Sequence, residues 1–495
     1  DIDYEQFAFA DGRRVRKRCG LYGPGGAEPG GHPGAARTSD HAFSVRRGPP
    51  DTATNVRSMS DHDPSHPARP ARPQDPGADA WRRAEHPPLS PPRREPTPSS
   101  GTFQPRVGSR FAIRRAGALA VVLAVAGVAF WYFGIREDPE PVAEPAPELL
   151  ELHGWAPYWA LEHSTPELRL RAEYFSEISP FWYQATGVET IEADPSSPDE
   201  ATAEFLRTAR REGVRIVPSI IDTLPAGEMA NILANDDQRR RHVAAIVDFV
   251  EEGEFDGVDI DYEQFAFADG RDTWDTTRPS WVAFIDELSD ELHSADRTLT
   301  VSIPPVYDDG RTNDSGYWVY DYAAITPMVD RIRVMAYDYS TEEPGPVAPL
   351  NWVRRAVQGT AEASGDPSKL VLGLPIYGYN WPIRVQGKCP ADDPSVGRTT
   401  VNIRTLDELV ERREARPVYD EDTGEYSFRY RLELSGGGDT CTQTRQVHYV
   451  EATGAQLRLE IAREADFGGV SLWAFGFENG TVWNRIIPSL AKSTD

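Results

Sequence analysis

Eight short apolar runs follow one another between residue 150 and the C-terminal end, and they restrict the possible folds most strongly. Longer stretches with helical spacing of apolar residues separate most of them. Strands alternating with helices predict an α/β fold with a covered parallel sheet, and eight such units predict a (β/α)₈ TIM barrel over 150–495. A doubly wound open sheet is the alternative, but no glycine-rich dinucleotide fingerprint follows the first run. The runs are 152–159, 178–183, 215–221, 257–262, 299–303, 332–337, 370–376 and 470–475, and helices are expected at 199–211, 238–252, 281–294 and 350–363.

An insertion, residues 380–449, separates the seventh predicted strand from the eighth. Its segment 416–430 has the pattern of a β-hairpin. Cys389 and Cys441 both lie in this insertion, and we expect them to form a disulfide in an oxidising compartment. His448 is the only histidine nearby, which makes a zinc site a weak interpretation, so no metal is expected here.

The first 149 residues differ in composition from the rest of the chain. Residues 59–115 are rich in Arg and Pro and poor in large apolar residues, which predicts a disordered tail. Residues 116–135 are twenty residues without a charge, long enough to cross a bilayer as a helix. Arginines precede this span, so the positive-inside rule predicts a cytoplasmic tail and an extracytoplasmic C-terminal part beyond a Pro- and Glu-rich linker, 136–149. A cleaved signal peptide, hence secretion, and a buried core helix are the alternatives.

Residues 1–13 repeat residues 259–271 letter for letter. A true internal repeat would include its supersecondary surroundings, which this copy lacks. The chain begins without a methionine, and Met59 is the only methionine before the predicted span. We therefore expect residues 1–58 to be a spurious or disordered extension, and we assign chemistry only to the downstream copy.

The charge of the chain limits its partners. The formal net charge is −26, and the acidic excess lies C-terminal to the predicted tail. Nucleic acid is therefore not an expected partner, because binding to phosphates needs a basic surface.

Three acids at alternate positions, Asp259, Asp261 and Glu263, occupy the fourth predicted strand. Apolar residues fill the positions between them, so a β-strand would turn all three acids to one face. In a covered parallel strand such a row is costly unless the acids share protons and hydrogen bonds. The pattern therefore favours catalysis, and a solvated edge strand is the structural alternative.

Aromatic residues gather where several predicted strands end. In α/β barrels the C-terminal ends of the strands carry the functional groups. Aromatic rings there suit stacking against the apolar faces of sugar rings. The aromatic-rich strand ends are 154–159, 335–339, 375–381 and 473–478.

These motifs together resemble glycoside hydrolase family 18, the chitinase-like barrels. Residues 256–263 match the family's pattern Asp-Gly-x-Asp-x-Asp-x-Glu in full. Met335, Tyr337 and Asp338 match its sixth-strand pattern Met-x-Tyr-Asp, and Trp473 matches its eighth-strand tryptophan. The resemblance covers about residues 150–488, and an α+β insertion after the seventh strand is typical of one branch of the family.

The resemblance implies a retaining mechanism in which the substrate's own 2-acetamido group attacks the anomeric carbon. It implies that Glu263 is the acid/base, that Asp261 orients the acetamido group, and that Asp259 shares a proton with Asp261. Like charges along one strand do not all ionise cheaply, which predicts a protonated Glu263 near neutral pH. The resemblance further implies catalytic contacts from Tyr337 and Asp338, substrate contacts from Trp473, Tyr158, Met335, Tyr377 and Trp381, and no cofactor.

Two departures from common chitinases indicate a branch within the family. The third strand lacks a Gly-Gly pair, and Tyr262 stands where many chitinases have tryptophan. Both features are similar to spore-cortex and other peptidoglycan N-acetylglucosaminidases. We therefore expect a membrane-anchored glycosidase acting on β-1,4-linked N-acetylglucosamine in peptidoglycan or chitin-like glycans. A non-hydrolytic, lectin-like protein is the main alternative, and a metal-dependent hydrolase is a weaker one because histidines are scarce.

Overall fold

The computed structural model describes residues 149–491, which belong to one compact unit. The predicted tail and the predicted membrane span lie outside the described residues, as does the repeated segment 1–13. No helix within 149–491 is long and apolar enough to cross a bilayer.

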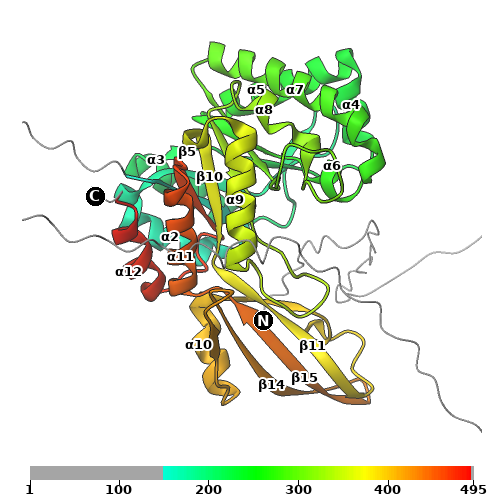
Figure 1. The fold of residues 1–495 in the computed structure, drawn as a ribbon, viewed down its shortest axis with the longest axis vertical. Helices are drawn as coiled ribbons and strands as arrows, with labels where there is room; N and C mark the ends of the chain where they lie inside the picture. The colour runs from blue at the N-terminus through cyan, green and yellow to red at the C-terminus, as the bar shows by residue number, and fades with distance from the viewer. Residues whose placement is uncertain (1–148, 492–495) are drawn as a thin grey trace, which may run out of the picture. The chain divides into compact units, whose positions relative to one another are not determined.

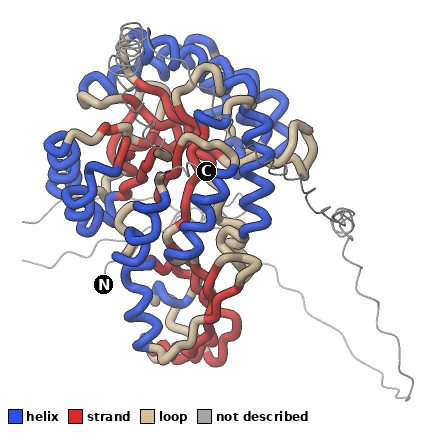
Figure 2. Tube along the Cα trace, turned by 60° about the vertical axis from the view of Figure 1, so that its left-hand side comes forward, coloured by secondary structure: helices blue, strands red, loops and turns tan. Residues whose placement is uncertain are grey.

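A curled sheet of mostly parallel strands forms the centre of the fold (Figure 2). Its strands follow the spatial order β4-β3-β6-β7-β8-β9-β10-β16-β1-β2-β5. The parallel pair β2–β5 lies at one end of this order and the pair β3–β6 at the other. Because the chain runs directly from β2 into β3 and from β5 into β6, the two ends come together and the sheet curls into a barrel-like ring. The strands are β1 (Glu151–Pro157), β2 (Phe175–Phe181), β3 (Tyr183–Ala185), β4 (Ile191–Ala193), β5 (Arg215–Ile216), β6 (Ser219–Asp222), β7 (Gly257–Asp261), β8 (Thr298–Ile303), β9 (Arg331–Val334), β10 (Leu370–Pro375) and β16 (Gly469–Trp473).

Two predicted strands are interrupted in the structure. The run 178–183 is divided at Trp182 into β2 and β3, and the run 215–221 is divided at Val217 and Pro218 into β5 and β6. Pro218 has no backbone N–H to donate to a neighbouring strand, which explains the second interruption. Each half still pairs in parallel with the corresponding half of the other strand.

Helices surround the ring of strands on its outer side (Figures 1 and 2). Asn235 begins α5 by accepting hydrogen bonds from the backbone N–H groups of Asp237 and Gln238, and Gly213, at a φ of 73°, ends α3. Helix α7 begins seven residues before the predicted start and contains Pro279 near its N-terminal end. The helices are α2 (Leu161–Arg171), α3 (Asp199–Glu212), α4 (Glu228–Ala234), α5 (Asp236–Glu252), α6 (Gln264–Phe267), α7 (Trp274–Ser294), α8 (Tyr322–Ile325), α9 (Leu350–Ser364), α11 (Ala452–Glu464) and α12 (Gly480–Ser489).

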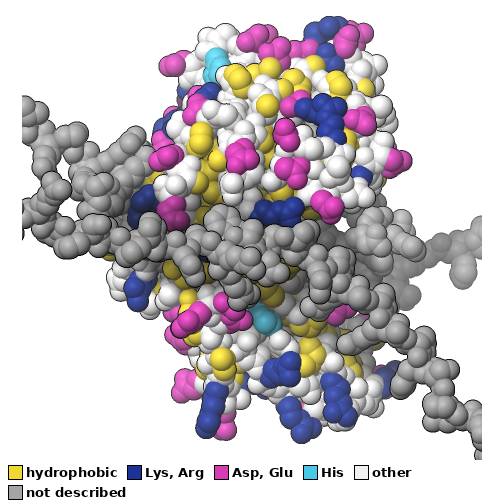
Figure 3. Space-filling view, viewed as in Figure 1, with side chains coloured by type: hydrophobic (Ala, Val, Ile, Leu, Met, Phe, Trp, Pro, Cys, Tyr) yellow, Lys and Arg dark blue, Asp and Glu magenta, His cyan; other side chains and the backbone are white. Residues whose placement is uncertain are grey.

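The insertion is a second, antiparallel sheet with one helix, seen at the bottom of Figure 1. Its spatial order is β12-β11-β15-β14-β13, and it begins at Tyr377, three residues before the predicted boundary. In the view of Figure 3, several Lys and Arg side chains lie over this sheet, whereas Asp and Glu side chains are spread over the helical part. Its elements are β11 (Tyr377–Gly387), β12 (Thr399–Asn402), α10 (Ile403–Arg412), β13 (Val418–Asp420), β14 (Glu425–Gly436) and β15 (Asp439–Tyr449).

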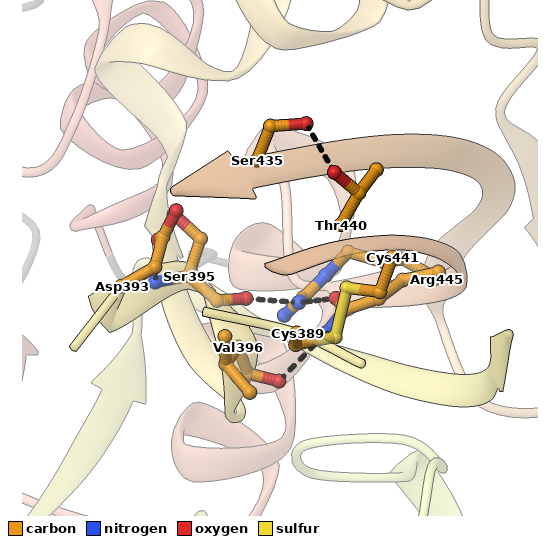
Figure 4. Close-up of a disulfide and its surroundings, with 9 residues drawn as sticks. Cys389, Asp393, Ser395, Val396, Ser435, Thr440, Cys441 and Arg445 are labelled. Atoms are coloured by element: carbon orange, nitrogen blue, oxygen red, sulfur yellow. Dashed lines mark hydrogen bonds between the residues drawn. A yellow bond between two sulfur atoms is a disulfide. The ribbon is translucent and has the colours of Figure 1, made fainter. Parts of the chain in front are cut away.

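The predicted disulfide between Cys389 and Cys441 is confirmed, with their Cα atoms 4.7 Å apart (Figure 4). It joins the loop after β11 to the third residue of β15. Beside it the buried side chain of Arg445 donates hydrogen bonds to the carbonyl oxygen of Ser395 and to the side chain of Asn380. The disulfide and this arginine together hold the loop that lies across the sheet.

A buried ion pair fixes the insertion against the barrel-like part. Arg458 of α11 contacts Glu425, the first residue of β14, at 3.0 Å, and neither side chain is more than 1 % exposed. Glu425 also accepts hydrogen bonds from the backbone N–H groups of Val347 and Ala348, just before α9. Because an unpaired charge at this depth would be strongly unfavourable, the pair keeps the insertion at a defined position on the rim.

Replacing both Cys389 and Cys441 with Ser is expected to destabilise the insertion. The disulfide closes a segment of 52 residues, and loop closure of that length stabilises a fold by about 2–4 kcal/mol. Hydrogen exchange of β14 and β15 in the oxidised protein and in the double variant measures the change. Equal protection in both proteins contradicts the expectation, and added reductant should have no effect on the double variant.

Candidate active site

The acid row lies on β7, whose five residues are all buried. Asp259 accepts hydrogen bonds from Trp155 on β1 (3.2 Å), Ser219 on β6 (2.6 Å) and Ser302 on β8 (2.8 Å). Arg333 on β9 adds a fourth contact at 3.0 Å. Donors from four other strands meet on this one carboxylate, so it points into the interior of the ring.

A buried arginine that sequence analysis missed compensates the charge of this interior. Arg333 is fully buried, and its guanidinium contacts both Asp259 and Glu177, the latter at 2.7 Å. It also donates to Ser179 and lies 5.2 Å from the ring centre of Trp155. The sequence signal for this site was an arginine within a predicted strand. A buried guanidinium requires anionic partners, so this arginine predicts acids nearby.

Asp261 is two residues further along the strand, and its Oδ1 atom is buried without a hydrogen-bond partner. Burial, and after it the negative charges of Glu263 and Asp259, raise the pKa of the Asp261 carboxyl well above its usual range. Such surroundings favour the protonated form of this carboxyl.

Glu263 follows the strand directly and begins helix α6, in a position that solvent partly reaches. Burial, and after it the negative charges of Asp222 and Asp338, raise the pKa of its carboxyl to about 8. A carboxylic acid that is protonated at neutral pH and accessible from outside has the properties of a general acid.

Asp222, the last residue of β6, is a second residue that sequence analysis did not assign to the site. Its Oδ1 atom accepts a hydrogen bond from the backbone N–H of Glu263 at 3.0 Å. Burial raises the pKa of the Asp222 carboxyl to about 7. Its signal in the sequence was a charged residue at the end of an otherwise apolar strand.

Tyr337 and Asp338 follow β9 and lie on the same side of the ring as Glu263, whose carboxyl is influenced by the Asp338 charge. Asp338 has a positive φ of 59° and is reached by solvent. It accepts hydrogen bonds from the hydroxyls of Tyr377 and Tyr379, the second at 2.8 Å. These tyrosines fix the direction of the Asp338 carboxyl, and Tyr379 is a further residue that the sequence analysis missed.

The remaining predicted contact residues divide into a partly exposed and a buried set. Trp473 ends β16, is partly exposed and packs edge-on against Phe181, with ring centres 4.8 Å apart. Tyr158 and Met335 are also partly exposed. Trp381 is buried and donates its indole N–H to the carbonyl of Thr341, and Tyr377 is buried as well. These two support the site from within, and their predicted sugar contacts remain predictions.

A small hollow, with space for about one water molecule, lies beside Tyr158 and Phe181, and Phe181 packs against Trp473. Aromatic and polar side chains line it, a combination that suits the apolar faces and hydroxyls of a sugar. Its lining residues are Tyr158, Trp159, Phe181, Trp182, Tyr183, Gln184, Asp194 and Ile221. Among residues 149–491, no group of three or more His, Cys, Asp or Glu side chains is placed to hold a metal ion.

The family model described as Glycosyl hydrolases family 18 matches residues 187–478 of this chain. The chain is similar to the uncharacterized glycosylase YvbX of Bacillus subtilis, with 26% identity over 52% of this chain and 69% of that protein. It is similar to the glycosylase YdhD of the same organism, with 29% identity over 50% of this chain. The matched part spans only 54% of the length of YdhD.

Among solved structures, the chain is similar to the spore cortex-lytic enzyme SleL of Bacillus megaterium, with a TM-score of 0.56 and 18% identity. The superposition covers 70% of this chain and 76% of that protein. At this level of identity the likeness shows the fold alone. It agrees with the curled, mostly parallel sheet seen here.

Replacing Glu263 with Gln is expected to stabilise the protein at pH 8 but not at pH 4. The pKa of the Glu263 carboxyl is about 8 in the folded protein, above the usual 4.5. The protonated acid therefore contributes its full stabilisation below about pH 4.5, and this contribution is lost as the pH rises through 8. Glutamine does not ionise, so the variant should gain on the order of 4 kcal/mol at pH 8. Thermal unfolding at both pH values measures this.

Glu478 provides a matched control, because burial raises the pKa of its carboxyl to about 8 as well. Glu478→Gln should show the same pH-dependent gain. The difference in stability between Glu263→Gln and the native chain should change with pH. An equal difference at both pH values would contradict the assignment of a proton to Glu263.

Proposed function

This chain belongs to glycosyl hydrolases family 18 and is a glycosidase, and we propose that it cleaves β-1,4-linked N-acetylglucosamine in glycans such as peptidoglycan or chitin. The observation that supports this proposal best is the pair of acids Asp261 and Glu263 at the end of β7, where burial and neighbouring acids raise the pKa of both carboxyls. The ring of paired strands, taken as a closed (β/α)₈ barrel, gives both acids a common opening.

In the proposed reaction Glu263 donates its proton to the glycosidic oxygen, and the bond from that oxygen to the anomeric carbon breaks. The carbonyl oxygen of the substrate's 2-acetamido group attacks the anomeric carbon and forms a positively charged oxazolinium ion. Water then attacks the anomeric carbon and reopens this ring, while Glu263 accepts the proton of the water. Two inversions leave the sugar with its original anomeric configuration.

Asp261 is proposed to hold the acetamido group during this reaction. Its Oδ1 atom has no hydrogen-bond partner in the described structure, so a substrate amide can engage this oxygen without breaking an existing bond. The nearby Asp259 carboxylate is already occupied by donors from three strands and by Arg333 on a fourth. We therefore place the mobile proton of this pair on Asp261. When Asp261 releases this proton toward Asp259, its own negative charge stabilises the positive oxazolinium ion.

The sugar ring is proposed to lie on Trp473, with Tyr337 and Asp338 donating and accepting hydrogen bonds at its edge. Trp473 is partly exposed, and Asp338 is held in place by Tyr377 and Tyr379. This arrangement combines an apolar platform with a few oriented polar groups, as carbohydrate sites require.

Peptidoglycan is the substrate we favour, with chitin oligomers second. The name of SleL describes that protein as a spore cortex-lytic enzyme. The predicted membrane helix 116–135, with the tail 59–115 in the cytoplasm, would hold the domain beside the cell wall. Localisation at the membrane is part of this proposal, and secretion is its alternative.

Glu263→Gln is expected to reduce hydrolysis at least about a hundredfold while glycan binding is preserved, because glutamine has the shape of the acid but no proton to donate. Release of reducing ends from purified sacculi and from chito-oligosaccharides, with product masses, measures the activity and ranks the two substrates. Glu478→Gln, which removes another acid whose pKa is raised to about 8, should retain the native rate. A native protein that binds these glycans without cleaving any of them would favour the lectin-like alternative, and an active Glu263→Gln variant would refute the assigned acid.

A further inference from the structure

We propose that Asp222 is a positioning residue for Glu263, holding the backbone of the acid and using its own charge to keep the acid protonated in alkaline solution. The inference rests on the proposed function, in which Glu263 is the proton donor. It adds to that function a residue from a neighbouring strand that does not touch the substrate.

The geometry places Asp222 directly beside the acid. Strand β6 runs parallel to β7 with Ile221 paired to Asp261, so Asp222 lies one step further along, level with the residues that lead into Glu263. The hydrogen bond from the Glu263 N–H to Asp222 Oδ1, 3.0 Å long, fixes the point where the chain leaves the strand and enters α6. Glu263 therefore depends on Asp222 for its direction.

The second oxygen of Asp222 indicates a role beyond this hydrogen bond. Asp222 is only 6 % exposed, and its Oδ2 atom is buried without a hydrogen-bond partner. Asparagine would accept the same backbone hydrogen bond without an ionisable group. A buried carboxyl is costly to maintain, so the charge itself, rather than the hydrogen bond, distinguishes the aspartate.

The surroundings determine when that charge appears. Burial raises the pKa of Asp222 to about 7, below the value of about 8 for Glu263. As the pH rises, Asp222 therefore ionises first, and its negative charge opposes ionisation of Glu263. The two carboxyls titrate as a coupled pair in which the one that does not react protects the proton of the one that does.

The titratable groups around this pair are mostly acids. Asp269, after α6, opposes the charge of Asp222 and accepts a hydrogen bond from the Gly227 N–H at 2.7 Å. Arg333 is a cation, and its charge acts on Asp261, which lies deeper in the ring than Glu263. The remaining titratable groups facing the pair are Asp261 on β7, Tyr262 directly after it, Tyr317 and Tyr320 at the 3₁₀ turn Trp318–Tyr320, and Tyr337 and Asp338 after β9.

Asp222→Asn and Asp222→Ala in the full chain separate the two roles. Asparagine keeps the acceptor for the Glu263 N–H but removes the charge, so the alkaline limb of kcat/KM against pH should move toward acid by about one to two pH units. The rate near pH 5–6 should stay close to native, because Asp222 is uncharged there in the native chain. Alanine removes both properties, so it should show the same shift and a lower kcat at every pH.

Asp269→Asn is the matched control, since it removes a neighbouring acid that acts on Asp222 and is not among the groups that shift Glu263. It should leave the alkaline limb within a few tenths of a unit of its native position. An Asp222→Asn enzyme with the native alkaline limb would overturn the inference and leave Asp222 as a purely structural cap.

A second measurement keeps the inference testable without any substrate. Infrared titration of the Glu263 carboxyl, identified as the band lost in Glu263→Gln, gives the ionisation of this group directly. The band should disappear at lower pH in Asp222→Asn than in the native chain. If the native protein cleaves no glycan yet the band shifts, the proposed function fails and the coupling stands, whereas an unshifted band refutes the coupling whatever the activity.

Discussion

The buried ion pair between Arg333 and Asp259 is the interaction on which the rest of this structure depends. Both side chains are fully buried, and they lie 3.0 Å apart inside the ring of strands. Glu177 shares the same guanidinium, so β2, β7 and β9 meet at one cation. Removing one member would leave a buried charge without its partner, which typically costs about 3–5 kcal/mol. The pair therefore determines both how these strands meet and where negative charge is tolerated.

A gradient of protonation follows from this pair along β7. Asp259, in contact with the cation and three further donors, is the carboxylate that the interior stabilises. Asp261 and Glu263 lie progressively farther from the cation, and the pKa of each carboxyl is raised by burial and by neighbouring acids. Three equally spaced acids on and just after β7 thus acquire three different roles: a carboxylate held by fixed donors, a proton carrier and an accessible acid. The proposed substrate-assisted mechanism uses all three.

Local patterns in the sequence predicted much of the fold and part of the site. Alternation of apolar and charged residues identified β7, and strand–helix alternation identified the curled sheet, because burial and backbone geometry act on neighbouring residues. The start of α7 was missed because Pro279 marks a helix boundary in most sequences but is accommodated inside this helix. The splitting of the second and third strands depends on pairings between residues about 40 positions apart.

The residues that sequence analysis missed act over long range. Arg333 meets Asp259 across 74 positions and Glu177 across 156, and Asp222 meets Glu263 across 41. These partners are far apart in the sequence, so no local spacing relates them. A charged residue on an apolar strand therefore predicts a buried charge but does not show which residue pairs with it. Tyr379 was missed because Tyr377 and Trp381 have the same local pattern, and only the fold shows which hydroxyls reach Asp338.

Neutron diffraction from deuterated crystals at pH 6 tests the central claim most directly, because it locates protons on individual carboxyl oxygens. We expect deuterium on Asp261 and on Glu263, and none on Asp259, whose oxygens should face deuterons donated by Arg333, Ser219 and Ser302. A deuteron bonded to Asp259, with Asp261 or Glu263 ionised, would contradict this account.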